Sequence, residues 1–163
     1  MPNKFYTGVG SRNTPTEILT LMTAIAHKLY AMNYILRSGG AAGADTAFEL
    51  GASQKKQIFT ANMTTKEAMD IASKYHPAWN KCSTFARKLH GRNAFQVLGP
   101  NLCKPSALLI CWTPDGCISH AERTINTGGT GTAISIANAY NVSIYNLQRA
   151  NHLDIWTKWT HSI

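Results

Sequence analysis

The 163-residue sequence has few charged residues and no long apolar run. Charged residues make up 15% of the chain and apolar residues 44%, a balance that excludes disordered and coiled-coil sequences and is sufficient for a buried core. No apolar stretch approaches the roughly 20 residues of a membrane-spanning helix, and the first residues lack the apolar segment of a secretory signal. We therefore expect one cytoplasmic domain, residues 1–163, without membrane contacts.

Several motifs of known chemistry are missing as well. The four cysteines, at positions 82, 103, 111 and 117, form no CxxC pair, and the six histidines show no HxxxH or HExxH spacing. The sequence therefore predicts neither a metal site nor a bound cofactor. The absence of GxxxxGK[ST] disfavours a Walker-type nucleotide triphosphatase, and the absence of GxSxG disfavours a serine nucleophile.

Acidic residues are scarce. Eight Asp and Glu against 16 Lys and Arg give a formal net charge of +8. Such an excess favours anionic partners, which include phosphates, nucleotides and nucleic acid, but it does not choose among them.

Short apolar strands alternate with amphipathic helices along the chain. Strands are expected at residues 4–9, 34–37, 56–60, 106–112 and 142–147. Helices are expected between them and in the tail, the first with Thr14 as N-cap and Glu17 completing a capping box. This alternation predicts an α/β fold with a mainly parallel sheet and helices on both faces.

Three glycine-rich turns each follow a predicted strand and precede a predicted helix. In a parallel sheet such turns lie at the carboxyl edge, where ligands bind in the crevice at which the strand order reverses. Glycine lets backbone N–H groups approach a ligand, and a helix start adds partial positive charge, which suits phosphate. The predicted ligand-binding residues of these turns are Gly10, Ser11, Arg12, Arg37, Ser38, Gly39, Gly40, Gly43, Asp45, Gly128, Gly129, Thr130, Gly131 and Thr132.

Two acidic residues follow the second turn, four positions apart on one predicted helix. Asp45 is expected to accept hydrogen bonds from a ribose or a base, and Glu49 is a second candidate for ligand contact. The alternative for both is stabilisation of the helix N-terminus through the helix dipole.

Basic residues near the turns have two interpretations. Arg12 and Arg37 flank the first two turns, where an arginine can bind phosphate in a bidentate manner. Arg92 and Asn93, on a basic helix face, are further candidates for ligand contact. The alternative is a surface charge for the arginines at the turns and a solvated face for the helix.

The segments YTGVGSR, LRSGGAAGADTAFELGA and GGTGTAISIANAYNVSIYNL resemble the SLOG superfamily. This Rossmann-like group includes the DprA recombination mediators, YspA- and YpsA-related proteins and the lonely-guy phosphoribohydrolases. The resemblance spans about residues 5–147 and is greatest to a small single-domain branch in bacteria and their phages. It implies a doubly wound sheet that binds a nucleotide or nucleotide-derived ligand across the three turns, and assembly into a homo-oligomer.

The third turn departs from the phosphoribohydrolase motif PGGxGTxxE, whose final Glu helps to break an N-glycosidic bond. Here Thr127 replaces the proline and Ser135 stands where the Glu should be. The phosphate cradle is kept while the catalytic residue is unknown. Asp45 and Glu49 are the first candidates to substitute for it, followed by Asp115 and Glu122.

Three functional hypotheses follow. The first is binding of a nucleotide-derived signalling molecule, with sequestration of an antiphage signal as an extension by analogy. The second is hydrolysis of a nucleotide N-glycosidic bond, in which a carboxylate stabilises the transition state. The third is binding of single-stranded nucleic acid through the positive charge.

Overall fold

The computed structural model describes residues 4–162 and contains a five-stranded parallel sheet in the order β3-β2-β1-β4-β5. The strands are β1 (Lys4–Gly8), β2 (Tyr34–Ser38), β3 (Lys56–Ile58), β4 (Leu108–Cys111) and β5 (Ser143–Asn146). The helices are α1 (Thr16–Ala31), α2 (Ala44–Ala52), α3 (Lys66–Tyr75), α4 (Thr84–Leu98), α5 (Thr130–Ala139) and α6 (Ala150–His161). Single 3-10 turns lie at Ala61–Met63, Trp79–Lys81 and Ile125–Thr127.

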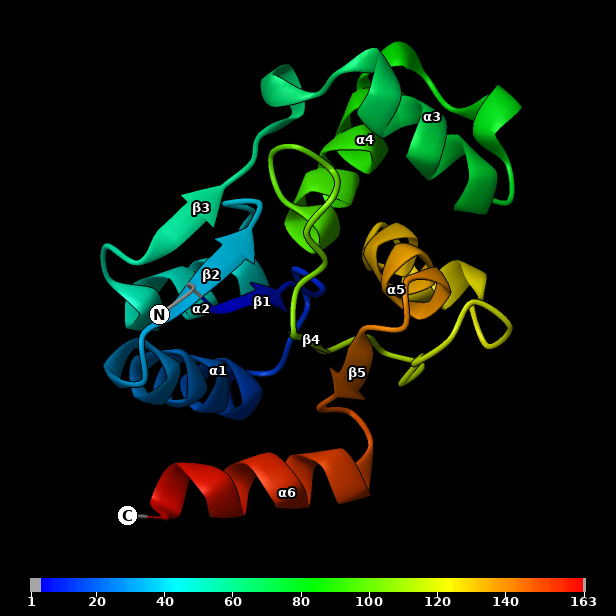
Figure 1. Cartoon of the computed structure of the whole chain (residues 1–163). Helices are drawn as coiled ribbons and strands as arrows, with labels where there is room; N and C mark the ends of the chain where they lie inside the picture. Colours follow the sequence, from blue (N-terminus) through cyan, green and yellow to red (C-terminus); the bar gives the residue numbers. More distant parts are fainter. Residues whose placement is uncertain (1–3, 163) are drawn as a thin grey trace.

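Helices cover both faces of the sheet (Figure 1). Helices α1, α2 and α6 enclose an apolar cluster that includes Tyr6, Met22 and Phe48. Helices α3, α4 and α5 cover the other face with a second cluster, which includes Phe95 and Ile134. The prediction of a doubly wound, Rossmann-like α/β fold is confirmed.

The strand order reverses between β1 and β4. Strand β1 pairs with β2 on one side and with β4 on the other. The chain first adds β2 and β3 on one side of β1, and then crosses over to add β4 and β5 on the other side. The pairing continues past the strand ends, where the Ser11 N–H donates to the Trp112 carbonyl at 3.1 Å. The carboxyl ends of β1 and β4 therefore form the crevice in which such sheets bind ligands.

The predicted start of the first helix is wrong. Helix α1 begins at Thr16 with Pro15 as N-cap, and no side chain among residues 4–162 caps it. The Thr14 hydroxyl instead donates to the Ser11 carbonyl at 2.6 Å, because the turn after β1 folds back on itself before the helix starts. By contrast, Thr65 caps α3, accepting from the Ala68 N–H at 3.2 Å.

None of the helices described between residues 4 and 162 has both the length and the hydropathy of a membrane span.

Candidate functional site

A cavity of about 600 Å³ lies at the carboxyl ends of β1 and β4. It is bounded by the loop after β1, the start of α2, one face of α4, the loop after β4 and the start of α5. Its volume falls within the range of pockets that bind small ligands. The predicted site residues that line it are Gly10, Ser11, Arg12, Asp45, Arg92, Asn93, Gly128, Gly129 and Thr130.

Glycines hold the first two turns against each other. A Cβ at Gly43, whose φ is +86°, would lie 2.8 Å from the Arg12 Cα and 2.8 Å from the Ser11 carbonyl oxygen. A Cβ at Gly10 would lie 2.8 Å from the Ala44 Cβ. Both glycines therefore serve the packing of one loop on the other, which brings Arg12 and Asp45 to the same cavity.

The third turn contains a glycine that the fold does not require. Gly129 has helical dihedrals, φ −62° and ψ −25°. Apart from its two chain neighbours and the adjoining backbone of its own helix, no heavy atom in the described part of the chain lies within 4 Å of a Cβ built there. Gly128, Gly129 and Thr130 line the cavity at the start of α5, and none of the side chains placed at 4–162 caps this helix. Backbone N–H groups at an uncapped helix start favour an anion.

Asp45 is an acidic group buried at the cavity wall. The residue is only 4% exposed, and its carboxylate accepts the Ala41 N–H at 3.3 Å. Burial raises the pKa of Asp45 to about 6, against the opposing charge of Arg92 and the amides of Ala41, Gly39 and Gly10. A carboxyl group that changes its ionisation near neutral pH inside a cavity is typical of functional sites.

Arg92 and Asn93 connect the second and third turns. The Arg92 guanidinium donates to the carbonyls of Gly39 at 2.9 Å and Phe59 at 3.1 Å, and also to the Asn93 side-chain oxygen at 3.2 Å. The Asn93 amide in turn donates to the Gly129 carbonyl at 3.1 Å. These two residues therefore fix the position of the third turn as well as line the cavity.

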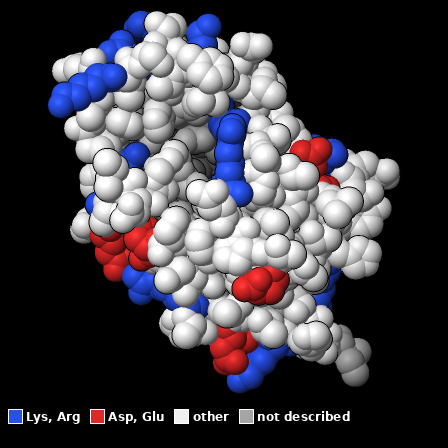
Figure 2. Space-filling model, turned by 180° about the vertical axis from the view of Figure 1, so that it is seen from behind, with Lys and Arg blue, Asp and Glu red and all other residues white. Residues whose placement is uncertain are grey.

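The side chains that line the cavity carry a small net positive charge. Its charged side chains are Arg12, Arg92 and Asp45, and Arg12 is exposed at the solvent side. Figure 2 shows the face of the molecule that lies behind the view of Figure 1, where the surface is hollowed and Lys or Arg side chains border the hollow. An anionic ligand is therefore electrostatically favoured in this cavity.

Two polar lining residues on α4, His90 and Gln96, were not predicted as ligand contacts from the sequence. His90 has its Nδ1 2.8 Å from the Thr132 hydroxyl, and burial together with His76, Arg123 and Arg92 lowers its pKa to about 4. Gln96 is 1% exposed, and its side-chain oxygen has no hydrogen-bond partner among residues 4–162. Both residues share one helix face with Asn93, at spacings of three, which is the signal that could have indicated them.

Arg37 lies outside the cavity, although it was predicted to contact the ligand. It is fully buried beside the C-terminal end of α4, where it donates to the Lys104 carbonyl at 2.6 Å and to the Ser106 hydroxyl at 3.2 Å. Its guanidinium also lies 4.1 Å from the centre of the Phe5 ring. These contacts fix the segment that leads into β4 to the sheet, which is a structural role.

The remaining predicted ligand contacts also lie outside the cavity lining. They are Ser38, Gly39, Gly40, Gly43, Gly131, Thr132 and Glu49. The Ser38 hydroxyl donates to the Gly8 carbonyl at 2.6 Å, and Glu49 forms an ion pair with Lys56 at 2.8 Å. Thr132 lies behind the cavity wall, where it supports His90.

Among the four carboxylates proposed to replace the missing Glu, Asp45 alone lines the cavity. Asp115 accepts hydrogen bonds from three threonine hydroxyls and one backbone N–H, which hold its own loop together. Glu122 is paired with Arg149 at 2.8 Å. Ser135, at the position of the missing Glu, is buried, with its hydroxyl 2.8 Å from the His120 Nδ1.

Comparison with known proteins supports the fold and no finer assignment. No protein-family model matches the chain, and no curated protein matches it. A solved structure of DNA processing protein A from Helicobacter pylori, a protein with a single-stranded DNA binding mode, is similar with a TM-score of 0.56 at 16% sequence identity. The similarity covers 99% of this chain and 74% of that one. The chain therefore has a DprA-like, Rossmann-like fold, as the sequence resemblance implied.

Proposed function

We propose that the cavity binds a nucleotide-derived small molecule, with its phosphate at the start of α5. The proposal rests on the presence of a glycine at position 129, in the cavity lining. Gly129 has ordinary helical dihedrals, and the space that a side chain would occupy there is open. Since neither backbone geometry nor packing requires a glycine there, the close approach of a ligand to the backbone accounts for it. The uncapped N–H groups of α5 provide the hydrogen-bond donors for a phosphate.

The other lining groups suit the remaining parts of a nucleotide. Arg12 is exposed at the cavity and can add a charged hydrogen bond to the phosphate. Asp45, once ionised, accepts hydrogen bonds from ribose hydroxyls. The unpaired side-chain oxygen of Gln96 can accept a hydrogen bond from the edge of a base.

The cavity suits a single small ligand better than a nucleic-acid strand. Single-strand binders stack successive bases on aromatic side chains in an open basic groove. The lining contributed by residues 4–162 includes no Phe, Tyr or Trp. A strand therefore lacks its usual stacking surface at this site.

Binding of single-stranded DNA is the second candidate. It is favoured by the fold shared with DNA processing protein A, whose single-stranded DNA binding mode is known, and by the net charge of +8. This candidate requires an affinity that falls steeply with salt concentration, because each neutralised phosphate releases counterions.

Cleavage of the bound nucleotide would depend on Asp45. It is the one proposed carboxylate in the cavity lining, and its raised pKa is typical of catalytic carboxyl groups. Release of free base that stops in an Asp45→Asn variant would assign N-glycosidic hydrolysis. Sequestration of a nucleotide signal, like homo-oligomer formation, stays a prediction.

Calorimetry tests these candidates together. The protein is titrated with a panel of mono-, di- and cyclic nucleotides, and with a single-stranded oligonucleotide at low and high salt. We expect one nucleotide of the panel to bind with a stoichiometry of one per chain and a weak salt dependence. Binding of the oligonucleotide alone, with a steep salt dependence, would replace the first proposal by the second.

A further inference from the structure

A cluster of metal-ligating side chains lies beside the cavity and is not used by the proposed function. It consists of His76 at the end of α3, Cys82 after the 3-10 turn Trp79–Lys81, and His90 on α4. Their potential ligand atoms all lie within 4.8 Å of one another, and all three residues are half-buried. The Cys82 sulfur is 3.8 Å from the Nδ1 and 3.7 Å from the Nε2 of His76, and the two imidazole rings are 4.3 Å apart.

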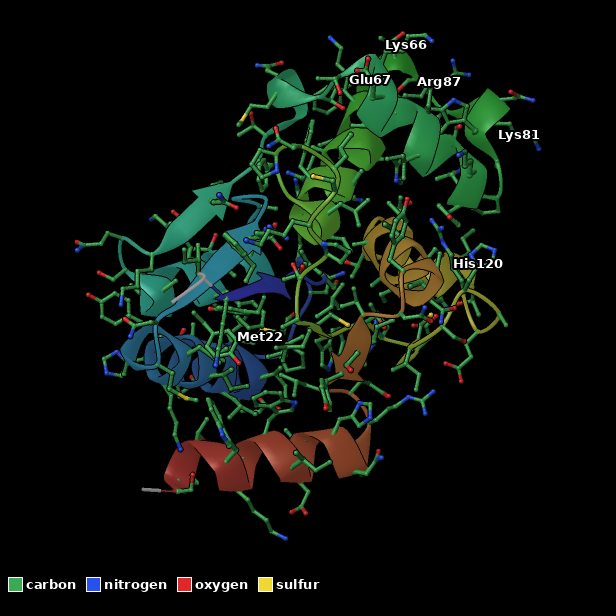
Figure 3. The ribbon with its side chains drawn as sticks, viewed as in Figure 1. Met22, Lys66, Glu67, Lys81, Arg87 and His120 are labelled. Carbon is green, nitrogen blue, oxygen red and sulfur yellow. The ribbon has the colours of Figure 1, made fainter. Side chains whose placement is uncertain are left out.

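The segment that carries His76 and Cys82 is fixed to α4. Arg87 donates through its Nη2 to the Trp79 carbonyl at 3.1 Å, and its guanidinium lies over the Trp79 ring. Figure 3 shows Arg87 and Lys81 at this end of the helix pair, away from the sheet. The turn therefore holds Cys82 against the two histidines by contacts that do not involve the three residues themselves.

The contacts of the His90 ring leave one of its nitrogens available to a metal ion. The Nδ1 of His90 lies 2.8 Å from the Thr132 hydroxyl. If Nδ1–H donates to that oxygen, Nε2 keeps a free lone pair, which is the usual arrangement of a metal-binding histidine.

His76 offers its lone pair on Nδ1, whereas His90 offers its lone pair on Nε2. Its Nδ1 accepts the Ala78 N–H at 3.0 Å, which places the ring hydrogen on Nε2 in the neutral form. An ion bound here replaces this local hydrogen bond.

We propose that His76, Cys82 and His90 bind one divalent transition-metal ion, and that Zn²⁺ suits them best. A thiolate with two imidazoles is a donor set that selects zinc and related ions over Mg²⁺ or Ca²⁺. Zn–N bonds of about 2.0 Å and Zn–S bonds of about 2.3 Å place tetrahedral ligand atoms roughly 3.3–3.5 Å apart. The distance of 3.8 Å from the Cys82 sulfur to the His76 Nδ1 needs only a small contraction to reach this geometry, and the ligand atoms of the three residues all lie within 4.8 Å of one another.

The charges around the cluster are balanced by the thiolate. Arg123 donates to the Tyr75 carbonyl at 2.9 Å and to the Thr132 hydroxyl at 3.0 Å, close to both histidines. The positive charge of Arg123 repels a divalent cation, and the negative charge of the Cys82 thiolate offsets this repulsion. Three protein ligands leave a fourth coordination position open, as in catalytic zinc sites. His90 also lines the cavity. The ion would therefore lie next to the proposed ligand.

Metal analysis and cobalt spectroscopy test the site. The full chain, purified without chelator and dialysed, should contain one equivalent of zinc by elemental analysis. After removal of the zinc, Co²⁺ should give the visible bands of tetrahedral coordination and a near-ultraviolet charge-transfer band from the thiolate. A wild-type protein that holds no stoichiometric metal, or whose cobalt form lacks the thiolate band, would overturn the proposal whatever the variants do.

Variants assign the ligands. Cys82→Ser should abolish the charge-transfer band, and His76→Gln or His90→Gln should weaken the binding of zinc at least about hundredfold. Thr132→Val should weaken it about tenfold, which is typical for loss of a partner that orients a ligand. Cys103→Ser and His161→Gln, both at exposed positions, are the matched controls and should leave binding unchanged. Circular dichroism verifies that each variant is folded, and full zinc binding by folded Cys82→Ser would refute the assignment.

Discussion

Replacing Asp45 with asparagine should stabilise the protein at neutral pH. The carboxyl group is 4% exposed, and burial raises its pKa from the ordinary 3.8 to about 6. The folded protein therefore holds this proton up to about pH 6, whereas the unfolded chain releases it near pH 4. Because the folded state binds more protons between these values, the free energy of unfolding falls as the pH rises through this window.

The expected size of the effect follows from the two pKa values. They differ by about 2, and each pH unit corresponds to about 1.4 kcal/mol, so ionised Asp45 lowers the free energy of unfolding by about 3 kcal/mol. An asparagine has nearly the same shape, can still accept the Ala41 N–H and cannot ionise. Above pH 6 the variant should therefore be more stable by up to about 3 kcal/mol. Below about pH 4 the difference should vanish, because the carboxyl group is then protonated in both states.

Urea denaturation of both proteins at about pH 4 and about pH 7.5 measures this difference. Asp70→Asn is the matched control, because the Asp70 side chain is 63% exposed and should change the stability by less than about 0.5 kcal/mol. An Asp45→Asn variant that is less stable than the wild type at about pH 7.5 would contradict this prediction. It would mean that Arg92 and the backbone amides outweigh burial.

Four further outcomes are expected. Gly129→Ala should change the stability by less than about 0.5 kcal/mol in urea but weaken nucleotide binding at least about tenfold by calorimetry, because its methyl group enters the cavity. Arg12→Gln should weaken binding about tenfold and reduce its salt dependence, with no change in melting temperature, because the residue is exposed. Arg37→Met should cost about 3 kcal/mol in urea, because it leaves buried carbonyls unpaired, and leave the nucleotide affinity of the folded protein unchanged. Affinity for a ribonucleotide should rise between about pH 5 and pH 7 as Asp45 ionises, and calorimetry should find no such rise in Asp45→Asn.

Most of the fold could be predicted from the sequence, because periodicity and glycine-rich turns are local signals. All five predicted strands are present, with each end within two residues of its predicted position, and the apolar run that becomes β4 is an interior strand between β1 and β5. The capping box at Thr14 failed because its hydroxyl had a nearer acceptor, the carbonyl of Ser11, in a turn that the pattern did not reveal. Competition between local hydrogen bonds decides such positions.

The cavity could be predicted only in part, since its walls are set by contacts between distant segments. The turns after β1 and before α5 were located from their glycines, and both line the cavity. Arg37 is next to a glycine-rich turn in sequence, but it points to the face of the sheet where the chain leads into β4. The roles of His90 and Gln96 depend on how α4 packs across the turns, which no single segment of sequence specifies.

The amide resonances of Gly128, Gly129 and Thr130 report most directly on whether a nucleotide binds at the start of α5. Isotope-labelled protein is titrated with the tightest nucleotide of the panel and followed by nuclear magnetic resonance. We expect these amides to shift most, together with those of Gly10 to Arg12, with a dependence on concentration that matches the calorimetric affinity. Saturable binding that leaves these amides unmoved and shifts another surface would contradict this expectation.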